Sequence, residues 1–397
     1  MKQAWAALVA ALLSASAFAQ SGPRDASPAL RGAIAAYRAG DLATAEAELR
    51  RLAPGDTNAE AWLGTLLIDR GRSPEGLQML QHALAANSPE AAHQLGLVYA
   101  QGLAGVTRDQ TRAAQLFEQA ANAGLSRAQL NLGVLYVRGQ GVPRDLVRAR
   151  GWLEKAAASN DPYALYALGR AMEESEGAAR ADPARAADLY RRAAELGHPL
   201  AALRYALALA DGEGIKQDAA GAQRWLMVAQ KDGVPEAALA LGDITARARN
   251  PRDKAANQKI LESAAAWYRV AADAGVPSAQ FKLANAYATG SGVGRDIGQA
   301  IGWYGRAAQQ GLPEAQLALG LLLIGGAGGT TDAVEGYKWL LLAERGGNTD
   351  SRVVREKASG RIADADRTRG ETLAAAFAAK PERPAVDTPP PLMRPQP

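Results

Sequence analysis

Residues 287–311 read YATGSGVGRDIGQAIGWYGRAAQQG, and residues 136–160 repeat the pattern as YVRGQGVPRDLVRARGWLEKAAASN. A glycine-rich loop before a helix can bind phosphate, because the helix N-terminus presents free backbone N–H groups. The dinucleotide-binding fingerprint, however, requires a preceding strand, whereas Gly290 follows KLANAYA, which has a helix-forming composition. Pro143 also stands in the column of Gly294, where a phosphate cradle needs an N–H donor. A pattern that recurs in this way indicates a structural repeat rather than a phosphate site.

Each repeat begins with a small residue that Leu-Gly, or an equivalent pair, follows four places later. These starts are Ala59, Ala91, Ala128, Ala164, Ala201, Ala237, Ala279 and Ala315. The glycine of the pair would let a neighbouring helix approach closely; it occurs as Gly96, Gly133, Gly169, Gly242 and Gly320. Each repeat ends on a residue suited to stop a helix in the left-handed conformation, namely Gly124, Asn160, Gly197, Gly233, Gly275, Gly311 and Gly347.

The residues between these marks predict two helices in each repeat. In the repeat from Ala128, Leu132, Leu135 and Tyr136 lie at helical spacing, and Trp152 and its neighbours form an apolar face on the following segment. A tryptophan column runs through Trp152, Trp225, Trp267, Trp303 and Trp339. Aspartates stand where the second helix needs an N-cap, at Asp109, Asp145, Asp218 and Asp296. Either helix alone would expose its apolar stripe, so we expect the repeats to stack.

This pattern resembles the Sel1-like repeat, a relative of the tetratricopeptide repeat with a longer loop between its helices. The resemblance covers roughly residues 90 to 347 and implies an all-α fold, a right-handed α/α solenoid of stacked helix pairs. Residues 29–88 look more like ordinary tetratricopeptide units. We therefore expect an N-terminal cap and transition in 20–88, the solenoid in 89–347, capping helices in 348–380 and a disordered proline-rich tail in 381–397. Two polar stretches, MEESEGAARADP and TARARNPRDKAANQKILES, are expected to bulge from the solenoid edge.

The first residues, MKQAWAALVAALLSASAFAQ, combine Lys2, an apolar run and an Ala-Phe-Ala site. This arrangement is typical of a secretory signal peptide, residues 1–19, cleaved after Ala19. We expect a periplasmic protein, with secretion as an open alternative, and no transmembrane segment in the mature chain. The 397-residue sequence contains no cysteine, so disulfides cannot support the fold and no lipid can attach to cysteine.

The sequence carries no pattern that predicts catalysis or cofactor binding. His82, His93 and His198 lie in different repeats, which disfavours a metal site, and His93 occupies a packing column. Glu173, Glu174 and Glu176 crowd one loop, and we expect them to be solvated. The basic stretch with Arg247, Arg249, Arg252 and Lys254 is likewise expected to be a solvated face. The net charge of +4 is too small to predict a nucleic-acid partner.

Stacked helix pairs offer an extended surface for recognition, which we expect the first helices to line. Polar residues on these helices are candidates for partner binding: Gln94, Gln101, Asn131, Arg138, Arg204 and Lys282. The absence of catalytic patterns favours a non-catalytic adaptor or scaffold that binds protein partners, and the resemblance implies envelope assembly components among them. The alternatives are an envelope hydrolase or binder of cell-wall or polysaccharide fragments that uses the acidic loop, and a secreted effector that binds host proteins.

Overall fold

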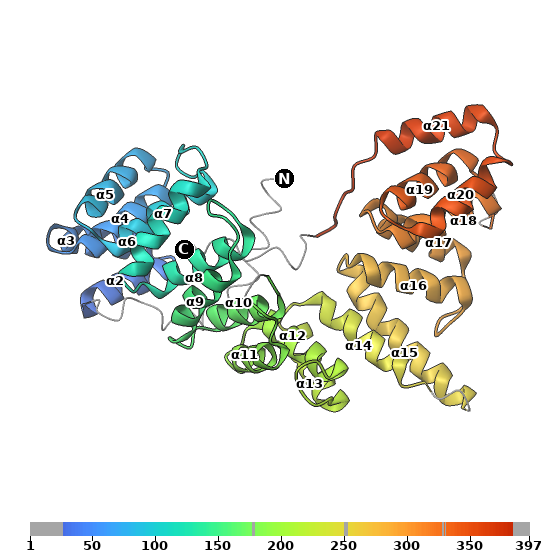
Figure 1. Cartoon of the computed structure of the whole chain (residues 1–397), viewed down its shortest axis with the longest axis horizontal. Helices are drawn as coiled ribbons and strands as arrows, with labels where there is room; N and C mark the ends of the chain where they lie inside the picture. The colour runs from blue at the N-terminus through green and yellow to red at the C-terminus, as the bar shows by residue number, and fades with distance from the viewer. Residues whose placement is uncertain (1–26, 177–178, 250–252, 328, 330, 384–397) are drawn as a thin grey trace. The chain divides into compact units, whose positions relative to one another are not determined.

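The computed structural model describes residues 27–176, 179–249, 253–327, 329 and 331–383 (Figure 1). The predicted signal peptide lies outside the described residues, as do residues 384–397 of the predicted tail. Regular structure in the described residues is helical, apart from one isolated β-bridge between Glu176 and Ala179. This confirms the predicted all-α class. None of the helices in these ranges is both long enough and apolar enough to cross a membrane.

The helices pack into two compact units, and the first contains the described residues up to Ala208 together with Gly212–Gln217. Here α2 to α11 form five consecutive helix pairs, and the second helix of each pair also contacts the first helix of the next. The helices are α2 (Pro28–Arg38), α3 (Leu42–Leu52), α4 (Thr57–Asp69), α5 (Ser73–Ala85), α6 (Pro89–Gln101), α7 (Gln110–Asn122), α8 (Ser126–Arg138), α9 (Leu146–Ala157), α10 (Pro162–Glu173), α11 (Pro183–Glu195) and most of α12 (Pro199–Asp211).

The second unit contains Leu209–Asp211 and the described residues from Asp218 onward. Three helix pairs, α14–α15, α16–α17 and α18–α19, stack in order, and both α20 and α21 pack against α19. The helices are α13 (Ala219–Lys231), α14 (Pro235–Arg247), α15 (Lys254–Asp273), α16 (Pro277–Thr289), α17 (Ile297–Gln309), α18 (Pro313–Gly325), α19 (Ala333–Arg345), α20 (Thr349–Ser359) and α21 (Asp364–Ala375). Each unit is thus a solenoid of helix pairs, as the repeat pattern predicts.

A glycine of the first helix brings the two helices of a pair into close contact. A Cβ added to Gly133 would lie 2.6 Å from Cγ of Leu153, and one added to Gly169 would lie 2.6 Å from Cε1 of Tyr190. A Cβ added at the other glycines of this column would crowd the equivalent side chain: Phe117 for Gly96, Tyr268 for Gly242 and Leu340 for Gly320. The predicted close approach is therefore confirmed. The side chain that fills the space is the residue after the tryptophan column.

The loop glycines of the quoted stretches let each loop contact the preceding repeat. Gly141 has a φ of +72°, and an added Cβ would lie 2.0 Å from the carbonyl oxygen of Gln110 at the start of α7. Gly292 has a φ of +75° and would meet the carbonyl oxygen of Leu261 at 2.2 Å. Since a backbone carbonyl already occupies the space beside these glycines, they serve packing between repeats.

The predicted helix stops and starts are also confirmed. Asp145 Oδ1 accepts a hydrogen bond from the backbone N–H of Arg148 at 3.0 Å, and Asp296 Oδ1 accepts one from Gln299 at 3.0 Å. Asp109 and Asp218 cap α7 and α13 in the same way. All seven predicted stop residues have positive φ, between 59° and 93°.

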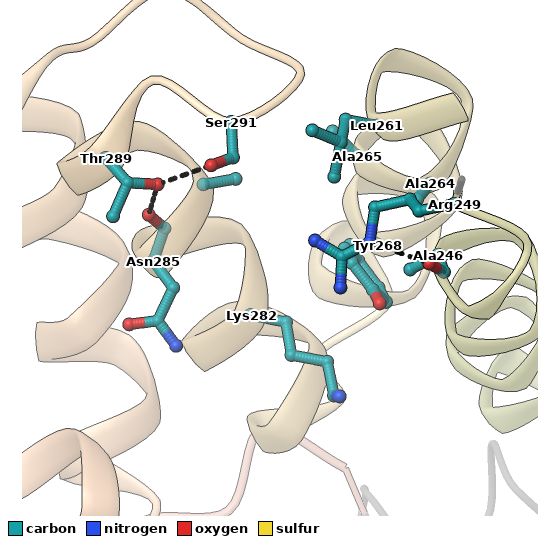
Figure 2. A pocket seen from close by; sticks show the side chains of 11 residues that line it. Ala246, Arg249, Leu261, Ala264, Ala265, Tyr268, Lys282, Asn285, Thr289 and Ser291 are labelled. Atoms are coloured by element: carbon teal, nitrogen blue, oxygen red, sulfur yellow. Dashed lines mark hydrogen bonds between the residues drawn. The ribbon is translucent and has the colours of Figure 1, made fainter. Parts of the chain in front are cut away.

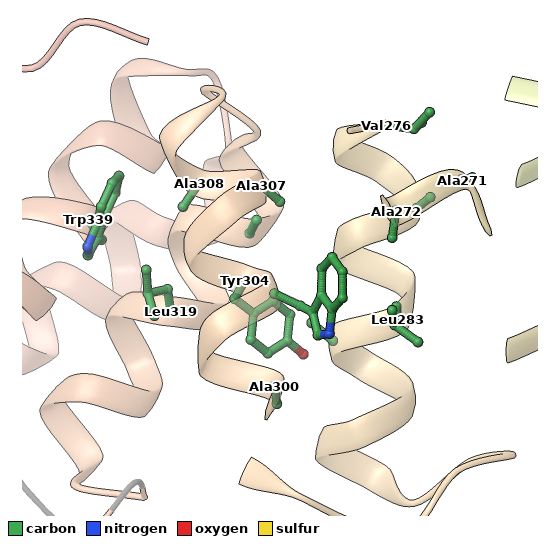
Figure 3. Close-up of a cluster of buried hydrophobic side chains, with 14 of the residues drawn as sticks. Ala271, Ala272, Val276, Leu283, Ala300, Tyr304, Ala307, Ala308, Leu319 and Trp339 are labelled. Carbon is green, nitrogen blue, oxygen red and sulfur yellow. The ribbon is translucent and has the colours of Figure 1, made fainter. Parts of the chain in front are cut away.

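Alanines and a few large side chains fill the core. Each of the eight alanines that start the repeats is at most 1% exposed. In the second unit, Tyr304 and Trp303 pack among Ala300, Ala307 and Leu319 in a single cluster (Figure 3). Trp339 is also buried, whereas Trp152, Trp225 and Trp267 are half-buried, so the tryptophan column lies at the edge of the core.

The second half of the longer polar stretch is a regular helix, which the sequence does not predict. Helix α15 begins at Lys254 and is 20 residues long, so much of the stretch extends the second helix of its pair. Asp253 Oδ1 accepts a hydrogen bond from the N–H of Ala256 and so caps the helix. The next residues, KAANQKILES, contain neither glycine nor proline, and their intrinsic preference is for helix. Local propensity therefore decides the structure here.

Candidate functional site

The first helices of the first unit carry a buried polar network centred on Glu90 of α6. Glu90 is 2% exposed and accepts hydrogen bonds from Gln94 Nε2 at 2.9 Å and from Arg127 Nη2 at 2.7 Å. The Arg127 guanidinium lies over the ring of Trp62, 5.4 Å from its centroid. This network links α4, α6 and α8, and the ion pair compensates both buried charges.

Gln94 and Asn131, two of the predicted contact residues, are buried in the first unit. Each is 3% exposed. Asn131 Nδ2 donates to Nε2 of His93, 3.2 Å away. Burial, together with the positive charge of Arg127, holds the pKa of His93 well below its usual value, so the ring is neutral. Neither Gln94 nor Asn131 is exposed enough to contact a partner, because both side chains are buried and hydrogen-bonded to neighbouring polar side chains.

Arg138, at the C-terminal end of α8, is the predicted contact residue with the least usual environment. It is half-buried, and its buried Nη2 has no hydrogen-bond partner among the described residues. Desolvation lowers the pKa of its guanidinium to about 10, so the group is still charged near neutral pH. Gln101 and Arg204 are half-buried as well, and both have polar or electrostatic contacts within the chain.

Lys282 belongs to the second unit, where it lines a small open pocket of about 200 Å³ (Figure 2). Its Nζ lies 2.9 Å from Asp243 Oδ1 and 5.6 Å from the ring centroid of Tyr268. Arg249 and Asn285 line the same pocket. Five of the six predicted residues belong to the first unit, and Lys282 belongs to the second.

The acidic loop after α10 is ion-paired rather than simply solvated. Arg144 Nη2 lies 2.5 Å from a carboxylate oxygen of Glu174, and Arg144 Nε lies 2.8 Å from one of Glu176. Glu173 pairs with Arg170 at 3.3 Å. The loop's carboxylates therefore help to hold it against the preceding loop.

The basic loop after α14 is partly occupied by contacts within the chain. Arg247 pairs with Asp211 at 2.9 Å, and Arg249 Nε donates to the carbonyl oxygen of Ala246. Arg252 lies outside the described residues. Across the parts of the chain that the structure describes, no group of three histidine, aspartate or glutamate side chains is arranged to hold a metal ion.

The segment after α21 lies along the second unit, which the sequence does not predict (Figure 1). The N–H of Lys380 donates to the carbonyl oxygen of Gln309 at 2.8 Å, and the N–H of Glu382 donates to Gln310 Oε1 at 3.0 Å. The Arg306 guanidinium donates two hydrogen bonds to the Glu382 carboxylate, at 3.0 and 2.6 Å, and lowers its pKa. These residues were expected to lie in or beside the exposed tail. The sequence signals for this binding are weak: the spacing of Pro381 and Pro384 and the single acidic residue between them.

Comparison with known proteins identifies the repeat. A family model described as the Sel1 repeat matches residues 89–125, 126–161, 162–198, 199–226, 261–276, 277–312 and 313–348. The matched ranges cover more than half of the chain. A crystal structure of a Sel1 repeat protein from Oxalobacter formigenes is 28% identical, with a TM-score of 0.61, over 89% of this chain and 99% of that chain.

Curated relatives share only part of their length with this chain. The ERAD-associated E3 ubiquitin-protein ligase component HRD3B of Arabidopsis thaliana is 38% identical over 102 residues, which are 25% of this chain and 16% of that protein. The chitin synthase regulator SKT5 of Saccharomyces cerevisiae is 43% identical over 61 residues, 15% of this chain and 9% of that protein. The similarity to these two relatives therefore extends over a quarter of this chain or less. Together with the match to the family model, it shows that this chain belongs to the Sel1 repeat family.

Proposed function

We propose that this chain is a non-catalytic adaptor that binds a protein partner through its repeat surface in the bacterial cell envelope. One observation carries the proposal: the repeats of the second unit hold residues 380–382 by hydrogen bonds to backbone and side chain. A surface that binds a segment without regular secondary structure in this way has the chemistry to bind such a segment of another protein. The two relatives described above are named a ligase component and a regulator, which fits a role beside other proteins.

The envelope location rests on the N-terminal segment, residues 1–19. Its short apolar run and Ala-Phe-Ala site favour export and cleavage after Ala19, which would place the mature chain in the periplasm. Release to the exterior, as an effector for host proteins, is the alternative outcome of the same signal. Fractionation of cells that express the full sequence, with mass analysis of the N-terminus, tests this part. A chain that keeps residues 1–19 and stays in the cytoplasm would contradict it.

Arg138 is a suitable contact for the partner in the first unit. Its Nη2 is buried and has no hydrogen-bond partner among the described residues, and a carboxylate or phosphate that reaches such a guanidinium stabilises it. The group retains its charge near neutral pH because its pKa is about 10. We therefore expect the partner to present an anionic group near the end of α8.

Affinity capture from an envelope extract tests the adaptor function. The parent should recover a defined protein, and Arg138→Gln should recover less of it. Lys216→Gln is the matched control, because Lys216 is an exposed cation of the same unit. If the parent recovers no protein above background, the proposal fails.

The structure offers no observation in favour of a hydrolase at the acidic loop, since Arg144 holds Glu174 and Glu176. Replacing Glu173, Glu174 and Glu176 together by alanine gives a direct test of that alternative. Loss of a wall-degrading activity that the parent possesses would revive it.

A further inference from the structure

The contact between Glu382 and the second unit defines a small carboxylate-binding site. Its carboxylate receives hydrogen bonds from Arg306 of α17 and, at 2.9 Å, from Gln280 Nε2 of α16. The Arg306 guanidinium lies over the ring of Trp303, 4.6 Å from its centroid. Gly275, at the turn before α16, leaves room for the glutamate, because an added Cβ would lie 3.0 Å from Cβ of Glu382. A cation on tryptophan, a glutamine and a glycine turn therefore make the site.

The helix pair α8–α9 of the first unit repeats these elements in the same register. Gln129 stands in the column of Gln280, and its Nε2 donates to the carbonyl oxygen of Ala121 at 3.2 Å, as Gln280 donates to Ala272. Lys155 stands in the column of Arg306, and its Nζ lies 4.1 Å from the ring centroid of Trp152. Gly124 stands in the column of Gly275, with a φ of +88° against +85°. The pair α8–α9 therefore contains a second set of the same groups.

The second set is not filled by the described part of the chain. An added Cβ at Gly124 would meet no atom within 4 Å, whereas the equivalent space at Gly275 contains Glu382. Lys155 is exposed, and no described carboxylate forms an ion pair with it. The ammonium group over an indole ring is attractive to a carboxylate, since the ring leaves the other side of the cation open.

We propose that Gln129, Lys155 and the turn at Gly124 bind the side-chain carboxylate of an extended segment of a partner protein. This inference rests on the proposed adaptor function and names the kind of segment that the first unit takes. The unit binds it as the second unit binds Glu382, with the carboxylate on the cation and the backbone across the turn.

The second unit also sets the spacing of acidic residues in such a segment. Ala379 lies against Gly311, and Glu382 lies against Gly275, one repeat earlier. Three residues therefore span one repeat, which fits an extended rise of about 3.3 Å per residue and helices about 10 Å apart. In the first unit the next cation of the row is Arg192, which donates to Asn160 Oδ1 at 3.0 Å. The preferred segment is therefore an acidic residue, two others, then a second acidic residue.

One contact of the second unit has no counterpart in the first. Ser159 replaces Gln310, and its hydroxyl donates to the carbonyl oxygen of Ala156. The hydrogen bond that Gln310 accepts from the segment's backbone is thus missing. Affinity in the first unit depends more on the two cations, so it should fall more steeply with salt.

A fluorescent peptide that copies residues 376–385, AFAAKPERPA, provides the probe, and binding is followed by anisotropy with the full chain. A second peptide carries Ala379→Glu, which places a carboxylate opposite Arg192. We expect the second peptide to bind more tightly. We expect Lys155→Glu to lower the affinity for both peptides by about tenfold or more, because a charge-assisted hydrogen bond is lost. Lys216→Glu, the matched exposed control in the same unit, should not weaken them. A peptide with Glu382→Lys should recover affinity for the Lys155→Glu variant.

Three results would overturn the inference. One is equal binding by the Lys155→Glu and Lys216→Glu variants. The second is a loss of peptide binding in the Arg306→Glu variant but not in the Lys155→Glu variant. The peptide would then bind in the second unit, where it would displace the chain's own residues 380–382. The third is no saturable binding of either peptide. These results concern the Lys155 site and not the adaptor function itself. If the Lys155→Glu variant still captured the partner as well as the parent does, the adaptor function would stand.

Sedimentation of the parent distinguishes a partner's segment from that of a second copy. We expect no concentration-dependent dimer. A dimer that Lys155→Glu dissociates would assign the site to the C-terminal segment of a second copy instead.

Discussion

Single glycines decide how closely the two helices of a repeat approach. At Gly133 the absent Cβ leaves room for the buried side chain of Leu153, while Gly151 on the second helix of the same pair has no atom within 4 Å of an added Cβ. The two glycines are both helical and without positive φ. Substituting alanine at each of the two positions therefore distinguishes the effect of packing from the effect of helix propensity.

Gly133→Ala should lower the free energy of unfolding by about 1–2 kcal/mol, because overpacking outweighs the gain in helix propensity. Gly151→Ala should raise it by about 0.5–1 kcal/mol, since alanine restricts the unfolded chain and meets nothing in the folded one. Urea unfolding of both variants checks this. A shift in the same direction for both would show that the glycine column is not a packing requirement.

His198 is a second residue whose environment has a measurable effect. It caps α12 through Nδ1, which accepts a hydrogen bond from the N–H of Ala201 at 3.2 Å, and its ring stacks on Tyr166 with 4.5 Å between centroids. Burial lowers its pKa to about 3. The unfolded side chain titrates near 6.5, so the unfolded chain binds a proton below that pH that the folded chain does not. Stability is therefore complete above about pH 6.5 and falls as the pH decreases toward 3.

Between about pH 7.5 and pH 5 this titration should lower the free energy of unfolding by about 2 kcal/mol. His198→Asn keeps a side chain that can cap the helix and removes the titration. The variant should lose about 2 kcal/mol less than the parent over that range, whatever its stability at the higher pH. Urea unfolding at the two pH values measures the difference, and identical losses would contradict the assignment.

At the scale of elements, the loop between paired helices joins one repeat to the one before it. Gly292 packs against the backbone of Leu261 within α15, and Gly294, two residues later, has no atom within 4 Å of an added Cβ. Both lie in the stretch whose glycines first suggested a phosphate site. Their different surroundings show which glycine the repeat requires.

Gly292→Ala should lower the free energy of unfolding by about 2 kcal/mol or more, since it combines positive φ with a backbone clash. Gly294→Pro should cost little, because Pro143 occupies the same column in the first unit. Thermal unfolding of the two variants tests the contrast. The account of the loop would be wrong if proline at 294 were the more damaging change.

The sequence predicts most of the elements because the repeat marks are local. The stops such as Gly124 and the caps such as Asp145 act through backbone geometry, so one residue is enough to place a helix end. Helix α15 was mispredicted where a polar composition was interpreted as a bulge, although helix propensity pointed the other way. Local propensity outweighed the repeat pattern there.

At the scale of the whole molecule, the candidate surface could be predicted only in part. The column through Gln94 and Asn131 looks polar in sequence, but burial depends on the neighbouring first helix, as the ion pair of Glu90 with Arg127 shows. The ion pair between Glu382 and Arg306 joins residues 76 positions apart, and the periodicity of the repeats cannot predict such a contact. The sequence places Arg138 on the first helix, one to two turns beyond that column, but the lack of a hydrogen-bond partner for its Nη2 among the described residues is visible only in three dimensions.

The central claim is that the repeat surface of this chain binds a protein partner. Titration of the purified captured partner into the mature chain, followed by calorimetry, tests it most directly. We predict saturable binding that Arg138→Gln weakens by about tenfold or more, with Lys216→Gln unchanged. The absence of saturable binding, or equal affinities for the parent and both variants, would contradict the account.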